Sequence, residues 1–294
     1  MPLLSPLTLL LSKLTLSATP LALLKRPAGR AHLALDLGFA VVSLVGHQSL
    51  LALGHFRDRS LLFIQGHWSF DPSRFGAWGT GLGFVIFVLV ASHTNYWVHR
   101  FSHTVPFLWR LHKCHHSQTA FTGLSNYRAH PLETVLGGYA TALVIALLCP
   151  FTSPWAKYYG YFIFGMGVLT HSELRTNFGV LEKVFITPLA HRAHHSLEPA
   201  HIDRNFGFSF SIWDRLYGTY VHVEPHEEFG LGIGEYAGLS PGWAVARSLQ
   251  EPFVSTGHPA GGGASRASGA SGASARTQTG GVAPALSPDS DSHP

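Results

Sequence analysis

Long apolar runs separated by short polar segments dominate the N-terminal half of the chain. The clearest single runs cover residues 31–54 and 80–98, and residues 134–172 form a double-length run that Pro150 and Pro154 interrupt. An α-helix needs roughly 17 to 25 apolar residues to cross the hydrocarbon core of a bilayer, and proline ends a helix. The pattern therefore predicts about four membrane-spanning helices, with the double run folded as a helical hairpin.

The two ends of the chain depart from this pattern. Residues 3–23 are apolar but contain Lys13 and end at Pro20, which leaves a fifth span, an interfacial helix and a signal-like segment all open. Residues 255–294 consist almost entirely of Gly, Ala, Ser, Pro and Thr, and such a composition buries too little apolar surface to offset its ordering entropy. We expect one membrane domain over residues 1–254, followed by a disordered tail.

Lys and Arg residues set the expected orientation of the spans. Short cytoplasmic loops carry the excess of positive charge, and the clearest cluster is Lys25, Arg26 and Arg30, just before the first strong run. With that cluster inside, the alternation of spans places residues 99–133 and everything after residue 172 in the cytoplasm. The expected fold is all-α, with multi-pass integral membrane helices that carry a cytoplasmic helical cap.

The composition supports a membrane protein and argues against other classes. Hydrophobic residues make up 46% of the chain and charged residues only 12%, about half the charged fraction of a typical soluble domain. The net charge of +4 comes from scattered Lys and Arg rather than a basic stripe, which argues against nucleic-acid binding. Cys114 and Cys149 are too few for a disulfide framework and form no Cys-x-x-Cys metal motif.

Histidine is the unusual residue of this chain, because its 20 copies equal Lys and Arg together. Two segments repeat the spacing i, i+3, i+4, and a third has two histidines four apart; on a helix these spacings share a face. The histidines are His99 and His103, then His112, His115 and His116, and finally His191, His194 and His195, with His171 at the end of the double run. Neutral imidazole is the commonest metal ligand in proteins, and eight ligands exceed the four of a tetrahedral zinc. The clusters therefore predict a site for two metals on the cytoplasmic side.

These segments resemble the fatty acid hydroxylase/sterol desaturase superfamily over about residues 80–221. The resemblance lies in the order of the motifs YWVHRFSH, RLHKCHHS, RAHPLE, HRAHHS and NFGFSFSIWDRLYGTY. It implies an integral-membrane helical fold whose cytoplasmic cap holds a non-haem di-iron centre. Enzymes of this kind use O2 to hydroxylate or desaturate an unactivated C–H bond of a lipid.

The resemblance also implies roles for single residues. The metal ligands would be His99, His103, His112, His115, His116, His191, His194 and His195. His171 and His130 are further candidate ligands, because family sites commonly recruit histidines between the second and third boxes. His130 is alternatively a hydrogen-bond partner that fixes the tautomer of a ligand.

Four other residues are candidate partners that orient the ligand histidines: His93, Glu133, Glu173 and Asp214. Two of them mark departures from the family pattern. Many members have an Asp where this chain has Ser92, and His93 is a candidate substitute for it. Glu173 stands where an Asn often follows the preceding Ser. These departures bear on the subfamily more than on the chemistry.

The leading functional hypothesis is an O2-dependent di-iron hydroxylase of a membrane lipid, with a fatty-acyl or sterol-like substrate; desaturation is the alternative. A zinc-dependent membrane hydrolase would be expected to carry His-Glu-x-x-His, which is absent. A metal transporter would place ionisable groups in mid-span rather than at span ends. The chain has no nucleotide, haem-attachment or iron–sulfur motif, so we expect electrons from a separate ferredoxin- or cytochrome-type donor and its reductase. The Ala- and Gly-rich tail hints at a GC-rich genome and so at a bacterial inner membrane.

Overall fold

The structure is a computed structural model that describes residues 24–42, 63, 66, 76–148 and 154–254. The predictions for residues 3–23 and for the tail lie outside these residues, as does the second half of the 31–54 run. Residues 27–42 are helical, and this helix includes the first half of that run, residues 31–42.

Helices and loops make up the described part of the chain, which contains two isolated β-bridges and no strand longer than that. The prediction of a helical fold is confirmed at this level. The α-helices are α4 (Gly76–Thr104), α5 (Pro106–His116), α6 (Pro131–Leu148), α7 (Pro154–Thr170), α8 (Pro188–His194), α9 (Ile212–Leu216) and α10 (Pro241–Gln250). Short 3-10 helices lie at η2 (Leu124–Tyr127), η3 (Gly179–Lys183) and η4 (Gly234–Tyr236).

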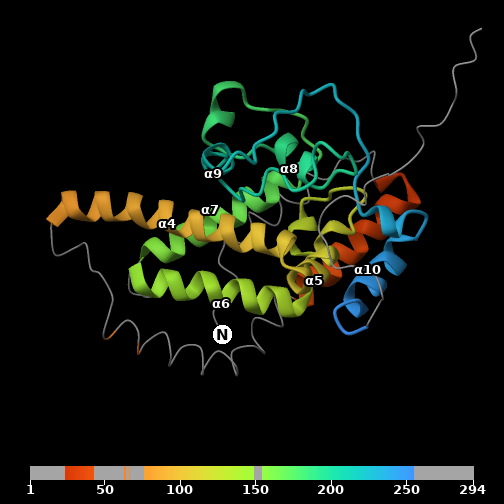
Figure 1. Cartoon of the computed structure of the whole chain (residues 1–294), viewed down its shortest axis with the longest axis horizontal. Helices are drawn as coiled ribbons and strands as arrows, with labels where there is room; N and C mark the ends of the chain where they lie inside the picture. Colours follow the sequence, from red (N-terminus) through yellow and green to blue (C-terminus); the bar gives the residue numbers. More distant parts are fainter. Residues whose placement is uncertain (1–23, 43–62, 64–65, 67–75, 149–153, 255–294) are drawn as a thin grey trace, which may run out of the picture. The chain divides into compact units, whose positions relative to one another are not determined.

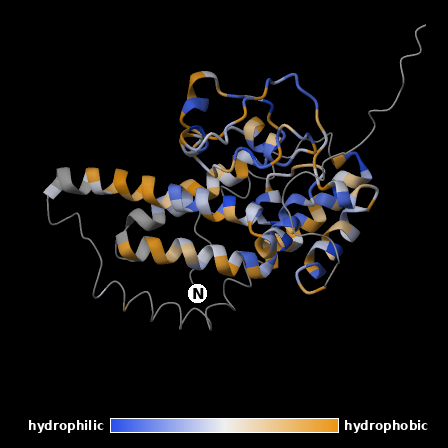
Figure 2. Ribbon diagram, in the orientation of Figure 1, coloured by the Kyte–Doolittle hydropathy of each residue, from blue (hydrophilic) through white to orange (hydrophobic). Residues whose placement is uncertain are grey.

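Helix α4 is the one described helix that is long and apolar enough to cross a membrane, over Gly81–Thr104. Its membrane-length part is mostly exposed, with Leu82 and Val85 more than half accessible. Figure 2 shows apolar residues along α4 and α6, and polar residues gathered around α5 and α8. An exposed apolar helix suits contact with lipid rather than a soluble core.

The helix that contains this predicted span extends beyond the end of the apolar run at residue 98. No proline or glycine interrupts the chain between Gly83 and Pro106, so α4 continues to Thr104 and carries His99 and His103. The first two predicted ligands therefore stand on the same rigid helix as the candidate span, not in a separate cap segment.

Two prolines direct the chain back toward α4. Pro106 is the first residue of α5 and cannot continue α4, so α5 starts a new direction after Val105. Pro188 likewise starts α8, where the Thr187 hydroxyl accepts a hydrogen bond from the Ala190 N–H at 3.1 Å.

The double apolar run divides into α6 and α7 as predicted, and α6 packs against α4 (Figure 1).

A buried ion pair joins the first helical segment to the loop before α6. The Asp36 carboxylate accepts hydrogen bonds from Thr122 Oγ1 at 2.6 Å and from Ser125 Oγ at 2.7 Å, and it pairs with Arg128. Asp36 and Arg128 are both fully buried. The hydropathy of the 31–54 run does not predict this contact, because an isolated charge in a lipid-facing helix would be costly; here the charge faces protein.

Candidate metal centre

Nine buried or half-buried histidines converge in two groups, and in each group one nitrogen per ring lies within 4.8 Å of the others. The first histidine group is His99, His103, His112, His116 and His194; the second histidine group is His115, His171, His191 and His195. Helices α4, α5 and α8 supply most of these rings, and His171 follows the last residue of α7. The rings of His116 and His195 stack with centroids 4.2 Å apart, so the two groups adjoin.

Each histidine triplet is divided between the two groups, which corrects the prediction that its three members converge together. His112 and His116 enter the first group while His115 enters the second. In the triplet at the end of α8, the single histidine His194 joins the first group, while the pair His191 and His195 joins the second. On a helix, residue i+4 lies about 40° from residue i, whereas i+3 lies about 60° away on the opposite side. The i, i+4 pairs therefore stay together, and the middle histidine reaches the other group.

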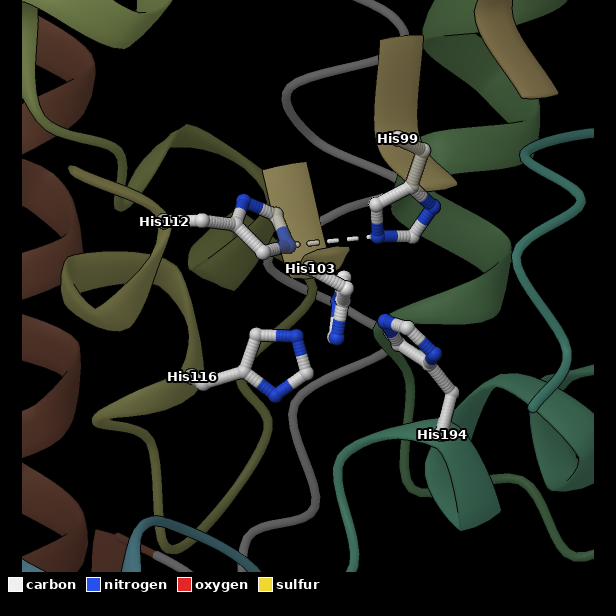
Figure 3. Close-up of side chains that lie close together, drawn as sticks. All are labelled: His99, His103, His112, His116 and His194. Carbon is white, nitrogen blue, oxygen red and sulfur yellow. Dashed lines mark hydrogen bonds between the residues drawn. The ribbon is translucent and has the colours of Figure 1, made fainter. Parts of the chain in front are cut away.

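The five side chains of the first histidine group point toward one another (Figure 3). The Nδ1 atoms of His99 and His194 each lie 2.7 Å from a backbone carbonyl, of Phe206 and Arg204 respectively. A carbonyl only accepts hydrogen bonds, so each Nδ1 carries the proton and each Nε2 presents a lone pair. The Nε2 atoms of His103, His116 and His194 are buried without a hydrogen-bond partner.

Two members of the second histidine group, His115 and His171, have the same polarity. Nδ1 of His115 donates to the Arg128 carbonyl at 3.0 Å, and Nδ1 of His171 donates to the Gly167 carbonyl at 2.8 Å. Their Nε2 atoms nevertheless face each other at 3.1 Å, and His191 Nε2 lies 3.0 Å from that of His171. Two facing lone pairs repel each other, and a cation between them removes that repulsion.

Burial keeps these imidazoles neutral. Desolvation, followed by the charges of neighbouring histidines, lowers the pKa values of His115, His116, His191 and His195 well below the ordinary value. Burial lowers the pKa of His194 to about 3. Neutral imidazole is the form that binds metals, so the donor set fits two metal ions. Cys114 is not a member of either group, and burial raises the pKa of its thiol to about 12.

His130 is the one predicted candidate ligand outside both groups. Its Nδ1 accepts a hydrogen bond from the Leu132 N–H at 3.1 Å, and its carbonyl accepts one from the Thr134 N–H. Both contacts lie at the first turn of α6, where backbone N–H groups lack helical partners. The structure therefore places His130 as a cap of α6.

The four predicted orienting residues fall in different places. Glu133 Oε1 lies 2.5 Å from His112 Nδ1 and contacts a candidate ligand directly. Asp214 acts one step away, because it accepts the Phe206 N–H at 2.7 Å and so fixes the residue whose carbonyl holds His99. Glu173 accepts from Arg192 at 3.0 Å, and His93 lies 2.7 Å from the Tyr217 hydroxyl in an aromatic cluster. Neither of these two contacts a member of the histidine groups.

Backbone carbonyls hold several of the rings, and the sequence analysis did not identify them. Asp203 and Asn205 have positive φ angles of 56° and 55°, and between them Arg204 turns its carbonyl toward His194. Asp and Asn adopt this left-handed conformation more readily than most residues. The Asp-Arg-Asn run after the last histidine box is the signal that predicts such a turn.

A cavity of about 470 Å³ borders both groups, lined by His99 and His112 from the first and by His115 and His191 from the second. Its other walls come from α4, α6 and α7 and are largely apolar, with Gly137, Gly138, Ala142, Gly160 and Ile163 among them. This size falls within the ordinary range of small-molecule sites, roughly 300–1,000 Å³. A ligand in the cavity would contact histidines of both groups.

The Glu133→Gln variant is expected to bind metal at the first histidine group about 10- to 100-fold more weakly, because outer partners of ligand histidines have effects of that size. The amide still accepts from His112 Nδ1 but brings no negative charge. The measurement is metal content after dialysis against a graded chelator series. Glu173→Gln is the matched control, since Glu173 pairs with Arg192; equal metal retention in both variants would contradict the assignment of Glu133.

The fold and the site together define a class, namely a helical protein with an apolar span-length helix and two buried all-histidine groups that could each hold a metal ion and that border one cavity. Residues 84–219 match the family model described as fatty acid hydroxylase. This match covers the region that carries the histidine motifs and confirms the resemblance seen in them.

The chain is also similar to curated enzymes of the same superfamily. It is 29% identical to the ornithine lipid hydroxylase OlsE of Rhizobium tropici over 74% of this chain and 62% of that protein. It is 32% identical to the alkylglycerol monooxygenase of Danio rerio over 46% of this chain and 30% of that protein. A third relative is the very-long-chain aldehyde decarbonylase GL1-9 of Oryza sativa subsp. japonica, with 31% identity over 47% of this chain and 54% of that protein. In each case the match spans less than two thirds of the relative. No solved structure matches the chain.

Proposed function

We propose that the chain is an O2-dependent hydroxylase of a membrane lipid, whose two histidine groups hold two iron ions. The observation that carries this proposal is the single cavity bordered by histidines of both groups. All-nitrogen ligation by neutral imidazole suits a redox metal such as iron. The similarity to a lipid hydroxylase and to an alkylglycerol monooxygenase supports lipid oxidation as the reaction class.

The iron ions, when bound, would supply the electron transfer that activates O2 toward a C–H bond. In the overall reaction one oxygen atom enters the lipid as a hydroxyl group. The other leaves as water, which takes two electrons from the donor and two protons. The remaining roles fall to the chain itself. Glu133 and the carbonyls of Phe206, Arg204, Arg128 and Gly167 hold the rings in one tautomer.

The apolar walls of the cavity position the lipid and keep water away from the reacting carbon. Ala142 and Ile163 contribute carbon surface, while the glycines of α6 and α7 leave room for an alkyl chain. Holding one C–H bond near the histidine groups would decide which carbon reacts, because proximity and orientation account for a large part of catalysis. The same geometry decides between hydroxylation and desaturation through the position of a second C–H bond.

We further propose that α4 crosses the bacterial inner membrane and that the histidine groups lie at its cytoplasmic end. The exposed apolar side chains of Leu82, Val85 and Ile86 support contact of this helix with lipid. The Lys25, Arg26 and Arg30 cluster supports the orientation. A separate ferredoxin- or cytochrome-type protein with its reductase would deliver electrons at this face.

The decisive experiment compares the lipids of cells with and without the chain, grown under ¹⁸O2. We expect lipids that gain one labelled oxygen, and metal analysis of the purified protein should find iron. Loss of two hydrogens without added oxygen would favour desaturation. Unchanged lipids, together with protein that retains only zinc after anaerobic iron loading, would overturn the proposal in favour of a zinc-dependent hydrolase or a metal carrier. Cells expressing His115→Ala are the control for oxidation by other enzymes.

A further inference from the structure

Besides the histidines and Glu133, the polar side chains of Asn95, Ser102, Asn126, Thr141 and Tyr159 line the cavity, and three of these five are joined by hydrogen bonds. The three are Asn95 on α4, Thr141 on α6 and Tyr159 on α7. Thr141 Oγ1 donates to Asn95 Oδ1 at 2.9 Å, and Asn95 Nδ2 donates to the Tyr159 hydroxyl at 3.2 Å. These residues, the polar trio, form one continuous chain of hydrogen bonds across the three helices that enclose the cavity.

The polar trio retains donors that no described residue uses. The Tyr159 hydroxyl accepts from Asn95, and the structure gives its proton no acceptor among the residues it describes. The second N–H of the Asn95 amide likewise has no acceptor among the described residues. Tyr159 is only 3% exposed, so water outside the protein does not satisfy it. A buried donor without an acceptor costs about 1–3 kcal/mol. An acceptor atom on the bound molecule would remove this cost.

The surroundings of the polar trio leave space for such an acceptor. Gly137 and Gly138 lie within one turn of Thr141 on α6, and Gly160 follows Tyr159 on α7. The carbonyl oxygen of an ester or amide projects sideways from an alkyl chain, and an ether oxygen needs no more width than a methylene group. The absence of side chains at these glycines therefore provides width where the donors stand.

The polar trio lies one helical turn from the metal ligands. Asn95 precedes His99 by four residues on α4, and both line the cavity. One turn of α-helix advances about 5.4 Å. An acceptor bound at Asn95 and Tyr159 is therefore separated from the histidine groups by only a few covalent bonds of the ligand.

We infer that the polar trio binds an acceptor oxygen in the linkage of the lipid substrate, in an ether, ester or amide, and thereby selects a carbon close to that linkage for oxidation. This inference rests on the proposed function, whose substrate class it narrows. The inference excludes tight binding of unsubstituted hydrocarbons. It also excludes oxidation at the far end of a long chain. The hydrogen bonds of the polar trio also join the three helices, so the test must separate recognition from packing.

The test measures ligand binding by the metal-loaded, full-length protein in detergent, without turnover. The probes are 1-methoxyhexadecane, methyl hexadecanoate and hexadecane, which share a sixteen-carbon chain, carry no hydroxyl group and differ in the linkage. We expect the wild-type protein to bind the two oxygen-bearing probes about tenfold or more tightly than hexadecane, the effect of one satisfied hydrogen bond. The stronger of the two identifies the linkage as ether or ester.

The Tyr159→Phe variant is expected to lose most of this preference while its affinity for hexadecane stays the same. Tyr158→Phe is the matched control on the same helix, because Tyr158 is 61% exposed and outside the cavity lining. Thr141→Val serves as a second variant should Tyr159→Phe fail to fold. A preference that survives both substitutions, or equal weakening of all three probes, would overturn the inference.

Failure of the proposed function gives a different pattern. Protein that discriminates among the probes but oxidises no lipid would leave the polar trio as a lipid-linkage site and would remove the hydroxylase proposal. Protein that adds labelled oxygen only at the distal end of the chain would keep the hydroxylase and overturn the inference.

Discussion

The His194→Ala variant is expected to bind fewer metal ions than the wild-type protein and to lose product formation. His194 Nε2 is buried without a partner and belongs to the first histidine group, while its Nδ1 is fixed by the Arg204 carbonyl. Removal of a ligand should exceed the roughly 10- to 100-fold effect of removing an outer hydrogen-bond partner. Metal content by mass spectrometry and ¹⁸O incorporation into lipid are the two measurements.

The matched control is His130→Asn, which removes a histidine in the same region of the chain. Asn is a good N-cap and preserves an acceptor for the Leu132 N–H at the start of α6. We expect this variant to retain wild-type metal content and activity. Metal loss in His130→Asn would return His130 to the ligand set, and full metal content in His194→Ala would remove His194 from it.

Mild acid is expected to destabilise the metal-free protein and to release the bound metal as pH falls below about 6.5. Above that pH the imidazoles are neutral in both the folded and the unfolded chain, so they do not affect the free energy of unfolding. Below it the unfolded chain takes up protons at about pKa 6.5, whereas burial holds the pKa of His194 at about 3 and those of His115, His116, His191 and His195 well below the ordinary value. The unfolded state then binds more protons, and stability falls.

The expected effect is large. Each histidine whose pKa is lowered in the folded state reduces the free energy of unfolding by up to about 1.4 kcal/mol per pH unit. The free energy of unfolding of a typical domain is only about 5–15 kcal/mol. Protons also compete with metal for the same nitrogens, so bound metal should leave over the same range. Thermal unfolding and metal content between pH 7.5 and 5 test this prediction.

His222→Ala is the control for the acid transition. His222 is exposed, and hydrogen bonding to Glu224 raises its pKa, so it favours the folded state at low pH rather than opposing it. Its removal should leave the steep transition in place. A stability profile that stays flat from pH 7.5 to pH 5 would show that His115, His116, His191, His194 and His195 do not remain neutral in the folded protein.

The sequence was sufficient to identify the histidines that meet in space. Nine of the ten candidate ligands fall into the two groups, because i, i+4 spacing on a helix is a local property that tertiary contacts do not alter. The double apolar run also divides into two helices near its prolines, as their missing N–H requires. His130 lies outside both groups because it directly precedes α6, where its Nδ1 accepts a hydrogen bond from the Leu132 N–H.

The partners of the rings could not be predicted in the same way. Glu133 could be predicted as a neighbour of a ligand because its carboxylate is a hydrogen-bond acceptor that the sequence shows. The acceptors at Phe206, Arg204 and Gly167 are backbone carbonyls, which no residue type indicates. Every residue has a carbonyl, and only the path of the backbone decides where it points. Asp36 is a similar case. Its neighbours in sequence are apolar and do not indicate that it pairs with the buried Arg128, which lies 92 positions later in the chain.

By itself, the sequence determined the helical class and nine of the histidines that meet in space, because these follow from hydropathy and from spacing along the chain. The order of its histidine motifs was sufficient to show the family resemblance. The tertiary structure alone decided how the histidines divide. Helices α5 and α8 each give an i, i+4 pair to one group and a single histidine to the other. It also brought Asn95, Thr141 and Tyr159 together on one cavity wall. Those arrangements depend on the packing of helices far apart in the chain, and packing is set by the whole fold rather than by any local pattern.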